Sequence, residues 1–188
     1  MPDAVPDDAG TLLLPTARAA IERELGIRAE LPKDRPAWAI APGASFVTLT
    51  AGGQLRGCIG SLEATRPLLS DVSVNAVAAA TKDPRFPPLT KAEWGGVSIE
   101  VSVLSAPTPL PASTLVDAYS KLRPGVDGVI VEMGAWNRAT FLPQVWEGLP
   151  TPEEFLAHLW AKAGMQPGTW HQDITLQTYT VRAWHEER

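Results

Sequence analysis

A predicted β-hairpin over residues 45–59 constrains the fold of this chain more than any other segment. Residues 45–50 alternate between apolar and polar side chains, and residues 51–54 (AGGQ) are of the types that hairpin turns favour. Residues 55–59 form the predicted return strand, which holds Cys58, the only cysteine of the 188 residues. The two arms of a hairpin pair antiparallel, so we expect an antiparallel sheet around this segment.

Helices and strands follow one another irregularly along the rest of the chain. The spacing of apolar residues predicts helices over residues 15–25, 67–82, 113–122 and 151–163. Strands are predicted over residues 97–104, 129–131, 139–142 and 174–181, the last followed by a charged tail. Because no regular βαβ order appears, this pattern favours an α+β fold, with a mainly antiparallel sheet flanked by helices. Residues 1–10 are predicted to be a loose N-terminal tail and residues 11–188 a single domain.

The predicted return strand places a cation near the cysteine. Side chains two positions apart lie on the same face of a strand, so Arg56 and Cys58 are expected to point the same way, where the guanidinium would stabilise a thiolate. Gly57 and Gly60 lack side chains and suit either a bulge or the close approach of a ligand. A lone cysteine in a half-apolar strand is also typical of a small buried core residue, so both interpretations of Cys58 stay open.

Glu100 lies in the middle of the predicted strand 97–104, whose apolar residues occupy the other face. If this strand shares a sheet or a cleft with the cysteine strand, Glu100, Arg56 and Cys58 converge. They would then supply an acid–base group, a cation and a nucleophile. The alternative is a solvated sheet face on which Arg56 and Glu100 form a cross-strand ion pair.

Composition argues against several classes of site and partner. The formal net charge of −5 and the isoelectric point near 5.2 make nucleic acid an improbable partner, since binding to phosphate backbones needs clustered Lys and Arg. One cysteine cannot form an internal disulfide or a Cys-rich metal site, and no metal-binding or phosphate-binding motif is present, so no metal and no cofactor is predicted. Because neither a signal peptide nor a long apolar run is found, we expect a soluble, cytoplasmic protein that is not bound to a membrane.

The histidines argue against a protease-like Cys–His pair. His158 is expected on the polar side of the last predicted helix, and His171 lies in a predicted loop. The third histidine falls in the charged tail, outside the predicted elements.

Several segments resemble the AMMECR family, and they do so in the same order. They are LRGCIG (55–60), DPRF (83–86), IEVSVL (99–104), DGVIV (127–131), TFLPQVW (140–146), FL (155–156) and KAG (162–164). The resemblance implies the same α+β architecture, with two lobes and a cleft near residues 55–60. Bacterial and archaeal members of the family are called AmmeMemoRadiSam system protein A. The resemblance implies a Memo-type protein and a radical-SAM protein as partners, and the composition suggests a bacterial source.

Three further residues are candidates for a shared ligand site because they belong to the part of the chain that resembles the family. Arg85 would bind an anionic ligand, or it ties its loop to Asp83. Asn75 would line the cleft, or it ties a helix to a loop, and Gln144 carries the same two interpretations.

Two functions from different classes follow from these residues. The first is a binding or adaptor component of an AmmeMemoRadiSam-type system, which recognises a small-molecule ligand or a partner chain. The alternative is an enzyme acting on a small or modified substrate, with Cys58 as nucleophile or redox thiol and Glu100 and Arg56 assisting. Whether catalysis occurs is left open by the sequence.

Overall fold

The chain folds into two compact units. The structure is a computed structural model that describes residues 5–187. The first unit contains the chain up to Leu104 and the segment from Arg182 onwards, and the second unit spans Ser105–Val181. The second unit is therefore inserted in the sequence between two strands of the first unit.

The sheet of the first unit is built around the predicted hairpin. Its strands run in the order β2-β1-β4-β9, and a short strand β3 also pairs with β1. They are β1 (Pro42–Ala51), β2 (Gln54–Gly60), β3 (Arg66–Pro67), β4 (Val97–Leu104) and β9 (Val181–His185). β1 pairs antiparallel with both β2 and β4. Gly52 and Gly53 form the turn with φ of 57° and 76°, the left-handed region that glycine occupies without strain. The predicted hairpin is confirmed.

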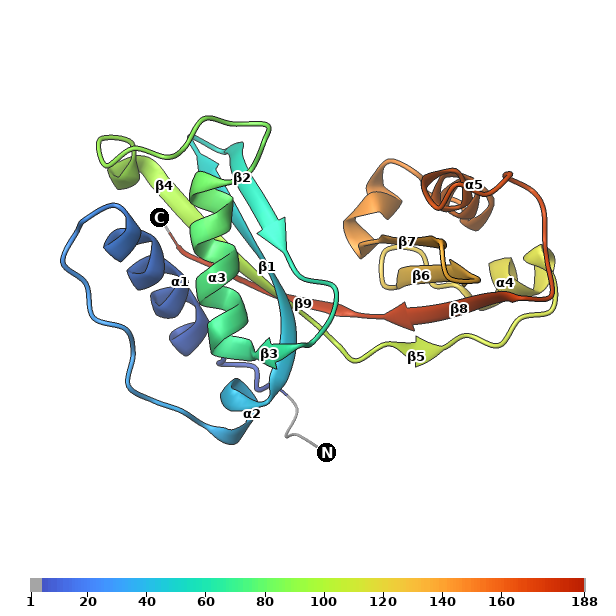
Figure 1. Cartoon of the computed structure of the whole chain (residues 1–188), viewed down its shortest axis with the longest axis horizontal. Helices are drawn as coiled ribbons and strands as arrows, with labels where there is room; N and C mark the ends of the chain where they lie inside the picture. Colours follow the sequence, from blue (N-terminus) through green and yellow to red (C-terminus); the bar gives the residue numbers. More distant parts are fainter. Residues whose placement is uncertain (1–4, 188) are drawn as a thin grey trace. The chain divides into compact units, whose positions relative to one another are not determined.

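Two helices cover one face of this sheet (Figure 1). The helical segments of the first unit are α1 (Gly10–Glu24), α2 (Ala37–Ile40), α3 (Leu68–Thr81) and a short 3-10 helix, η1 (Trp94–Gly96). Val47 and Leu49 of β1 and Ile99 of β4 are fully buried against apolar residues of α1 and α3. Each such side chain contributes roughly 1.5–3 kcal/mol to stability. Because side chains alternate along a strand, the residues at the intervening positions of β1 and β4 lie on the opposite face of the sheet.

The second unit has its own antiparallel sheet and its own core. Its strands run in the order β5-β8-β6-β7. They are β5 (Thr108–Pro109), β6 (Gly128–Met133), β7 (Asn137–Phe141) and β8 (Ile174–Tyr179), accompanied by α4 (Leu115–Lys121), η2 (Pro143–Glu147) and α5 (Pro152–Lys162). Trp146 stacks on Phe155 of α5 with ring centroids 3.8 Å apart, and Trp160 is fully buried. Trp146 is thus a core residue.

The α+β class is confirmed, but α1 and the predicted strand over residues 174–181 differ from the sequence prediction. α1 begins at Gly10 rather than at Pro15, because Leu12 and Leu13 are buried and extend the apolar stripe toward the N-terminus. Of the predicted loose tail, residues 1–4 lie outside the described residues, whereas Ala9 is only 1% exposed.

The predicted strand over residues 174–181 is in fact two strands in two sheets. β8 ends at Tyr179, and β9 continues through residues that were predicted to be a charged tail. The charges of this segment have partners in the fold: Glu186 forms a two-point ion pair with Arg18 of α1, with Nε to Oε1 at 2.5 Å.

Candidate functional site

Three polar side chains form a row across neighbouring strands on the face of the first sheet opposite α1 and α3, here called the polar face. Thr48 in β1 lies directly opposite Cys58 in β2 and directly opposite Glu100 in β4. All three side chains are partly exposed. Cys58 and Glu100 therefore lie in one sheet, which the sequence left open, with Thr48 between them.

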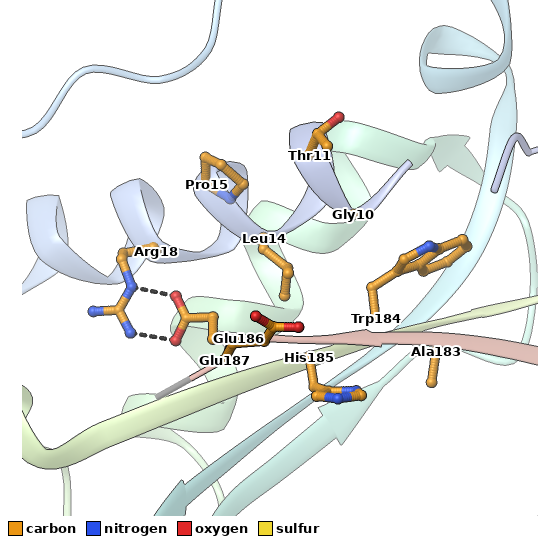
Figure 2. Close-up of a pocket in the computed structure, with 10 residues that line it drawn as sticks. All are labelled: Gly10, Thr11, Leu14, Pro15, Arg18, Ala183, Trp184, His185, Glu186 and Glu187. Atoms are coloured by element: carbon orange, nitrogen blue, oxygen red, sulfur yellow. Dashed lines mark hydrogen bonds and ion pairs between the residues drawn. The ribbon is translucent and has the colours of Figure 1, made fainter. Parts of the chain in front are cut away.

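His185 extends this row onto β9. The backbone N–H of Glu186 donates to the carbonyl of Ile99 at 3.0 Å, and Ser105 N–H donates to the carbonyl of Thr180 at 2.8 Å. The two bonds fix an antiparallel register in which His185 lies opposite Glu100. Figure 2 shows the His185 side chain pointing away from α1, on the side opposite Trp184. The row therefore reads Cys58, Thr48, Glu100, His185.

The geometry of the row separates its reactive groups. Neighbouring strands lie about 4.8 Å apart, so Cys58 and Glu100, two strands apart, are separated by about 10 Å at the backbone. The Thr48 hydroxyl donates to Cys58 Sγ at 3.3 Å, and the Ser102 hydroxyl donates to Glu100 Oε1 at 3.4 Å. The sulfur and the carboxylate thus make hydrogen bonds to neighbouring hydroxyls, and a ligand that touched both would have to span the row.

The backbone of Cys58 is held by the loop that follows α3. Cys58 N–H donates to Asp83 Oδ2 at 2.8 Å, and Arg85 Nη2 donates to the Cys58 carbonyl at 3.4 Å. Arg85 also forms a two-point ion pair with Asp83, with Nη2 to Oδ2 at 2.7 Å. This hydrogen-bonded guanidinium, helped by the Cys58 N–H, holds the pKa of buried Asp83 well below its usual range despite burial. The loop therefore protects the β2 edge at the cysteine.

Arg85 follows the second of its two predicted interpretations. It ties its loop to Asp83, and this ion pair also raises the pKa of the Arg85 guanidinium. The side chain of Arg85 remains 53% exposed.

The expected pairing of Arg56 with Glu100 does not form. A register shift between Leu49 and Thr50 leaves Arg56 as an extra residue in β2, a β-bulge that breaks the alternation on which the prediction rested. Arg56 Nε and Nη2 instead donate to Glu93 Oε1 at 3.2 and 3.1 Å. Hydrogen bonds from Thr90, together with those from Arg56, lower the pKa of Glu93.

Gly57 and Gly60 of the segment 55–60 allow other groups of the same chain to approach β2 closely. A Cβ on Gly57 would lie 2.1 Å from the carbonyl oxygen of Ala79 in α3, and a Cβ on Gly60 would lie 2.2 Å from the ring of Phe46. Of the two predicted options, the bulge is present in β2, beside Gly57. What approaches these two positions is a helix backbone and an aromatic ring of the same chain.

Asn75 belongs to a buried polar network. Its side-chain amide is 3% exposed and donates to the Ser45 carbonyl and to Asp71 Oδ2, each at 2.9 Å. The fully buried Asp71 also accepts from the Ser45 N–H and from Arg66 Nε, each at 2.8 Å. Asn75 therefore ties α3 to β1, and its bond to Ser61 Oγ at 3.2 Å ties the helix to the loop after β2, as the second of its two predicted interpretations held.

Gln144 lies in η2 of the second unit, and its side chain is exposed. His158 is exposed on α5, where its Nδ1 lies 2.9 Å from the Glu154 carbonyl, in agreement with the sequence prediction. Among residues 5–187, no group of three or more His, Cys, Asp or Glu side chains is placed to hold a metal ion. The same residues contain no helix that is long and apolar enough to cross a membrane.

Sequence reasoning missed Thr48 and His185 as members of the row. Thr48 appeared only as one residue of an alternating strand, and His185 was placed in the charged tail. Their membership follows from the cross-strand register, which local patterns do not contain.

Comparisons with known proteins agree with the resemblance of the sequence segments. The AMMECR1 family model matches residues 14–184. A protein of Methanothermobacter thermautotrophicus is 40% identical over 188 residues, which cover 96% of this chain and 95% of the relative. Protein MJ0810 of Methanocaldococcus jannaschii is 37% identical over 170 residues, covering 87% of this chain and 82% of the relative.

A solved structure supports the same assignment. The crystal structure of the uncharacterized protein PH0010 from Pyrococcus horikoshii matches with a TM-score of 0.82 and 36% identity, covering 97% of this chain and 93% of that chain. The organisms of these relatives leave the bacterial source of the chain a prediction. The family match spans both units, and the chain belongs to the AMMECR1 family.

Proposed function

We propose that the protein is a binding component of an AmmeMemoRadiSam-type system and that its polar face contacts the ligand or partner. The observation that carries the proposal is the row of Cys58, Thr48, Glu100 and His185 in register across four strands. In the described part of the first unit, both long helices pack on the opposite face of the sheet. An antiparallel sheet with one face left uncovered offers its side chains to another molecule.

The geometry of the polar face fits a binding role better than a catalytic role. Cys58 and Glu100 are about 10 Å apart at the backbone, beyond the reach of a nucleophile–base hydrogen bond. Both neighbouring cations are neutralised, Arg56 by Glu93 and Arg85 by Asp83. What remains is a row of hydrogen-bonding side chains with one carboxylate, which suits recognition of a polar surface.

The partner class rests on the resemblance to AmmeMemoRadiSam proteins. The test is a calorimetric titration of the purified chain with the Memo-type protein of the same organism. We expect saturable binding that weakens at least about tenfold in Glu100→Ala, because a lost hydrogen bond to a charged group typically costs more than the 1.4 kcal/mol that corresponds to tenfold. The matched control is Glu24→Ala, an exposed carboxylate at the end of α1.

Two results would count against the proposal. If the wild-type chain shows no heat of binding with the Memo-type protein or with the radical-SAM protein, the proposed partners are wrong. If Glu100→Ala and Glu24→Ala bind equally well, the polar face is not the contact surface.

The hydrogen bond from Thr48 to Cys58 Sγ favours one alternative, an enzyme that uses Cys58 as nucleophile or redox thiol. An activated thiol reacts with a small electrophile faster than free cysteine does, by about tenfold or more. The enzyme alternative predicts such a rate for Cys58 in the native chain and a marked change in Thr48→Val. Native alkylation no faster than that of free cysteine, and unchanged in Thr48→Val, would exclude an activated nucleophile.

A further inference from the structure

The strand β9 presents an unpaired edge at one end of the first sheet. Glu186 donates its backbone N–H toward β4, so the backbone groups of Ala183 and His185, at alternate positions, point away from β4. Both residues are exposed, and among residues 5–187 β4 is the only strand that pairs with β9. Proteins usually protect such an edge, because it is a ready template for another strand.

A hollow of about 690 Å³ lies between this edge and α1 (Figure 2). Leu14 and Pro15 of α1 and Trp184 of β9 give it an apolar lining. The Trp184 indole packs directly against Gly10, because a Cβ at Gly10 would lie 2.7 Å from Trp184 Cδ1. The hollow lies directly beside the unpaired edge, where it can receive a side chain of a second strand.

We propose that β9 pairs antiparallel with β9 of a second copy of this chain, with the two-fold axis passing beside Trp184. In this register Ala183 lies opposite His185 of the second copy, and the outward backbone groups of both strands become paired. Trp184 lies opposite its own equivalent, in the hollow beside α1, where cross-strand aromatic pairs are favourable.

The charges of β9 are complementary in this register. Arg182, which pairs with Asp7 of its own chain, faces Glu186 of the second copy, which pairs with Arg18, and Val181 faces Glu187, so no like charges lie opposite one another. A shift by one hydrogen-bonding step would place His185 opposite His185, or Arg182 opposite Trp184. The two-fold pairing makes one continuous sheet from two first units, the closed self-complementary contact of a C2 dimer. The proposal does not depend on the proposed function.

The first test is the oligomeric state of the full chain, measured by sedimentation equilibrium over micromolar to submillimolar concentrations. We expect a monomer–dimer equilibrium in the wild type. Ala183→Pro removes an N–H that points away from β4, a position at which edge strands tolerate proline, and should weaken the dimer by about 10- to 100-fold. Ala183→Ser, the control, keeps the N–H and should dimerise like the wild type. A wild type that stays monomeric throughout, or Ala183→Pro dimers of wild-type affinity, would overturn the proposal.

The second test reads the register and does not require the proline variant to fold. In a Cys58→Ser background, Ala183→Cys and His185→Cys are made separately, equilibrated as a mixture and oxidised. Opposite residues of a hydrogen-bonded pair lie about 5.5 Å apart at Cα, within the roughly 4.4–6.8 Å that a disulfide spans. We expect a crosslinked dimer from the mixture and little from either variant alone. Crosslinking of either variant alone, or none in the mixture, would refute this register.

Discussion

At the scale of single residues, β2 packs closely on its neighbours because its glycines have no side chains. Gly57 faces α3, where the Ala79 carbonyl would lie 2.1 Å from an added Cβ. Gly60, on the polar face, lies beneath the ring of Phe46. Cys58 is held between these two contacts, and its backbone is bonded to Asp83. The position of the sulfur therefore depends on close packing around it.

Gly57→Ala should destabilise the first unit by about 1–3 kcal/mol, because a helix carbonyl cannot move aside as a flexible side chain can. The measurement is the free energy of unfolding in urea. Gly96→Ala is the control, since a Cβ at Gly96 meets nothing within 4 Å and should change stability by no more than about 0.5 kcal/mol. Equal stability of the two variants would contradict the packing of β2 on α3.

Asp83 should make stability depend on pH in the acid range. Its pKa is depressed in the folded protein, so its contribution is present above the unfolded value of about 3.9 and is lost as the pH falls through the lower folded value. Asp83→Asn is therefore expected to cost about 1–3 kcal/mol near neutral pH, since it weakens the acceptor for the Cys58 N–H and removes the ion pair. The difference from wild type should shrink steadily below about pH 4.

Urea unfolding of both chains at neutral and acid pH provides the check. Asp34→Asn, at an exposed carboxyl in the loop before α2, is the control and should follow the wild type at both pH values. A stability difference for Asp83→Asn that stays constant or grows on acidification would contradict the assigned ion pair.

At the scale of elements, α5 shows how local sequence sets a boundary. Thr151 Oγ1 accepts from the Glu154 N–H at 3.3 Å and donates to Glu154 Oε2 at 2.9 Å, and Pro152 occupies the first helical position. Thr151 is thus the N-cap of α5, and the Glu154 carboxylate bonds the Thr151 hydroxyl, so one of the two backbone bonds of a capping box is present. Thr151→Ala should destabilise the second unit by about 1 kcal/mol, whereas Thr151→Ser should retain most of the stability. Thermal unfolding followed by circular dichroism distinguishes them, and equal losses in both variants would show that the cap does not stabilise α5.

Elements with a local signal were predictable, and those fixed by distant partners were not. The β1–β2 hairpin, β4 and α5 each carry alternation, turn residues or caps in their own sequence. β9 was missed because its charged residues look like a solvated tail until Arg18 and Asp7 are seen to pair with them. The bulge at Arg56 was named only as an option, since its position depends on the register with β1.

At the scale of the whole molecule, the family was predictable and the site was predictable in part. The segments that suggested the AMMECR family span both units, each of which has its own core. The sequence named Cys58 and Glu100 but left open whether they share a sheet, and Thr48 and His185 join them only through the pairing of strands. No local pattern reports which side chains face one another across a sheet.

The most direct test of the polar face as a binding surface is the alkylation rate of Cys58, read by mass spectrometry with and without a saturating amount of the Memo-type protein. Because Cys58 is partly exposed at the end of the row, its sulfur should react in the free chain and should be protected when the face is covered. We predict at least about a tenfold slower reaction in the complex, as expected for a side chain buried at an interface. An unchanged rate, in a mixture shown by calorimetry to be bound, would place the partner elsewhere on the molecule and rule out the polar face as its binding surface.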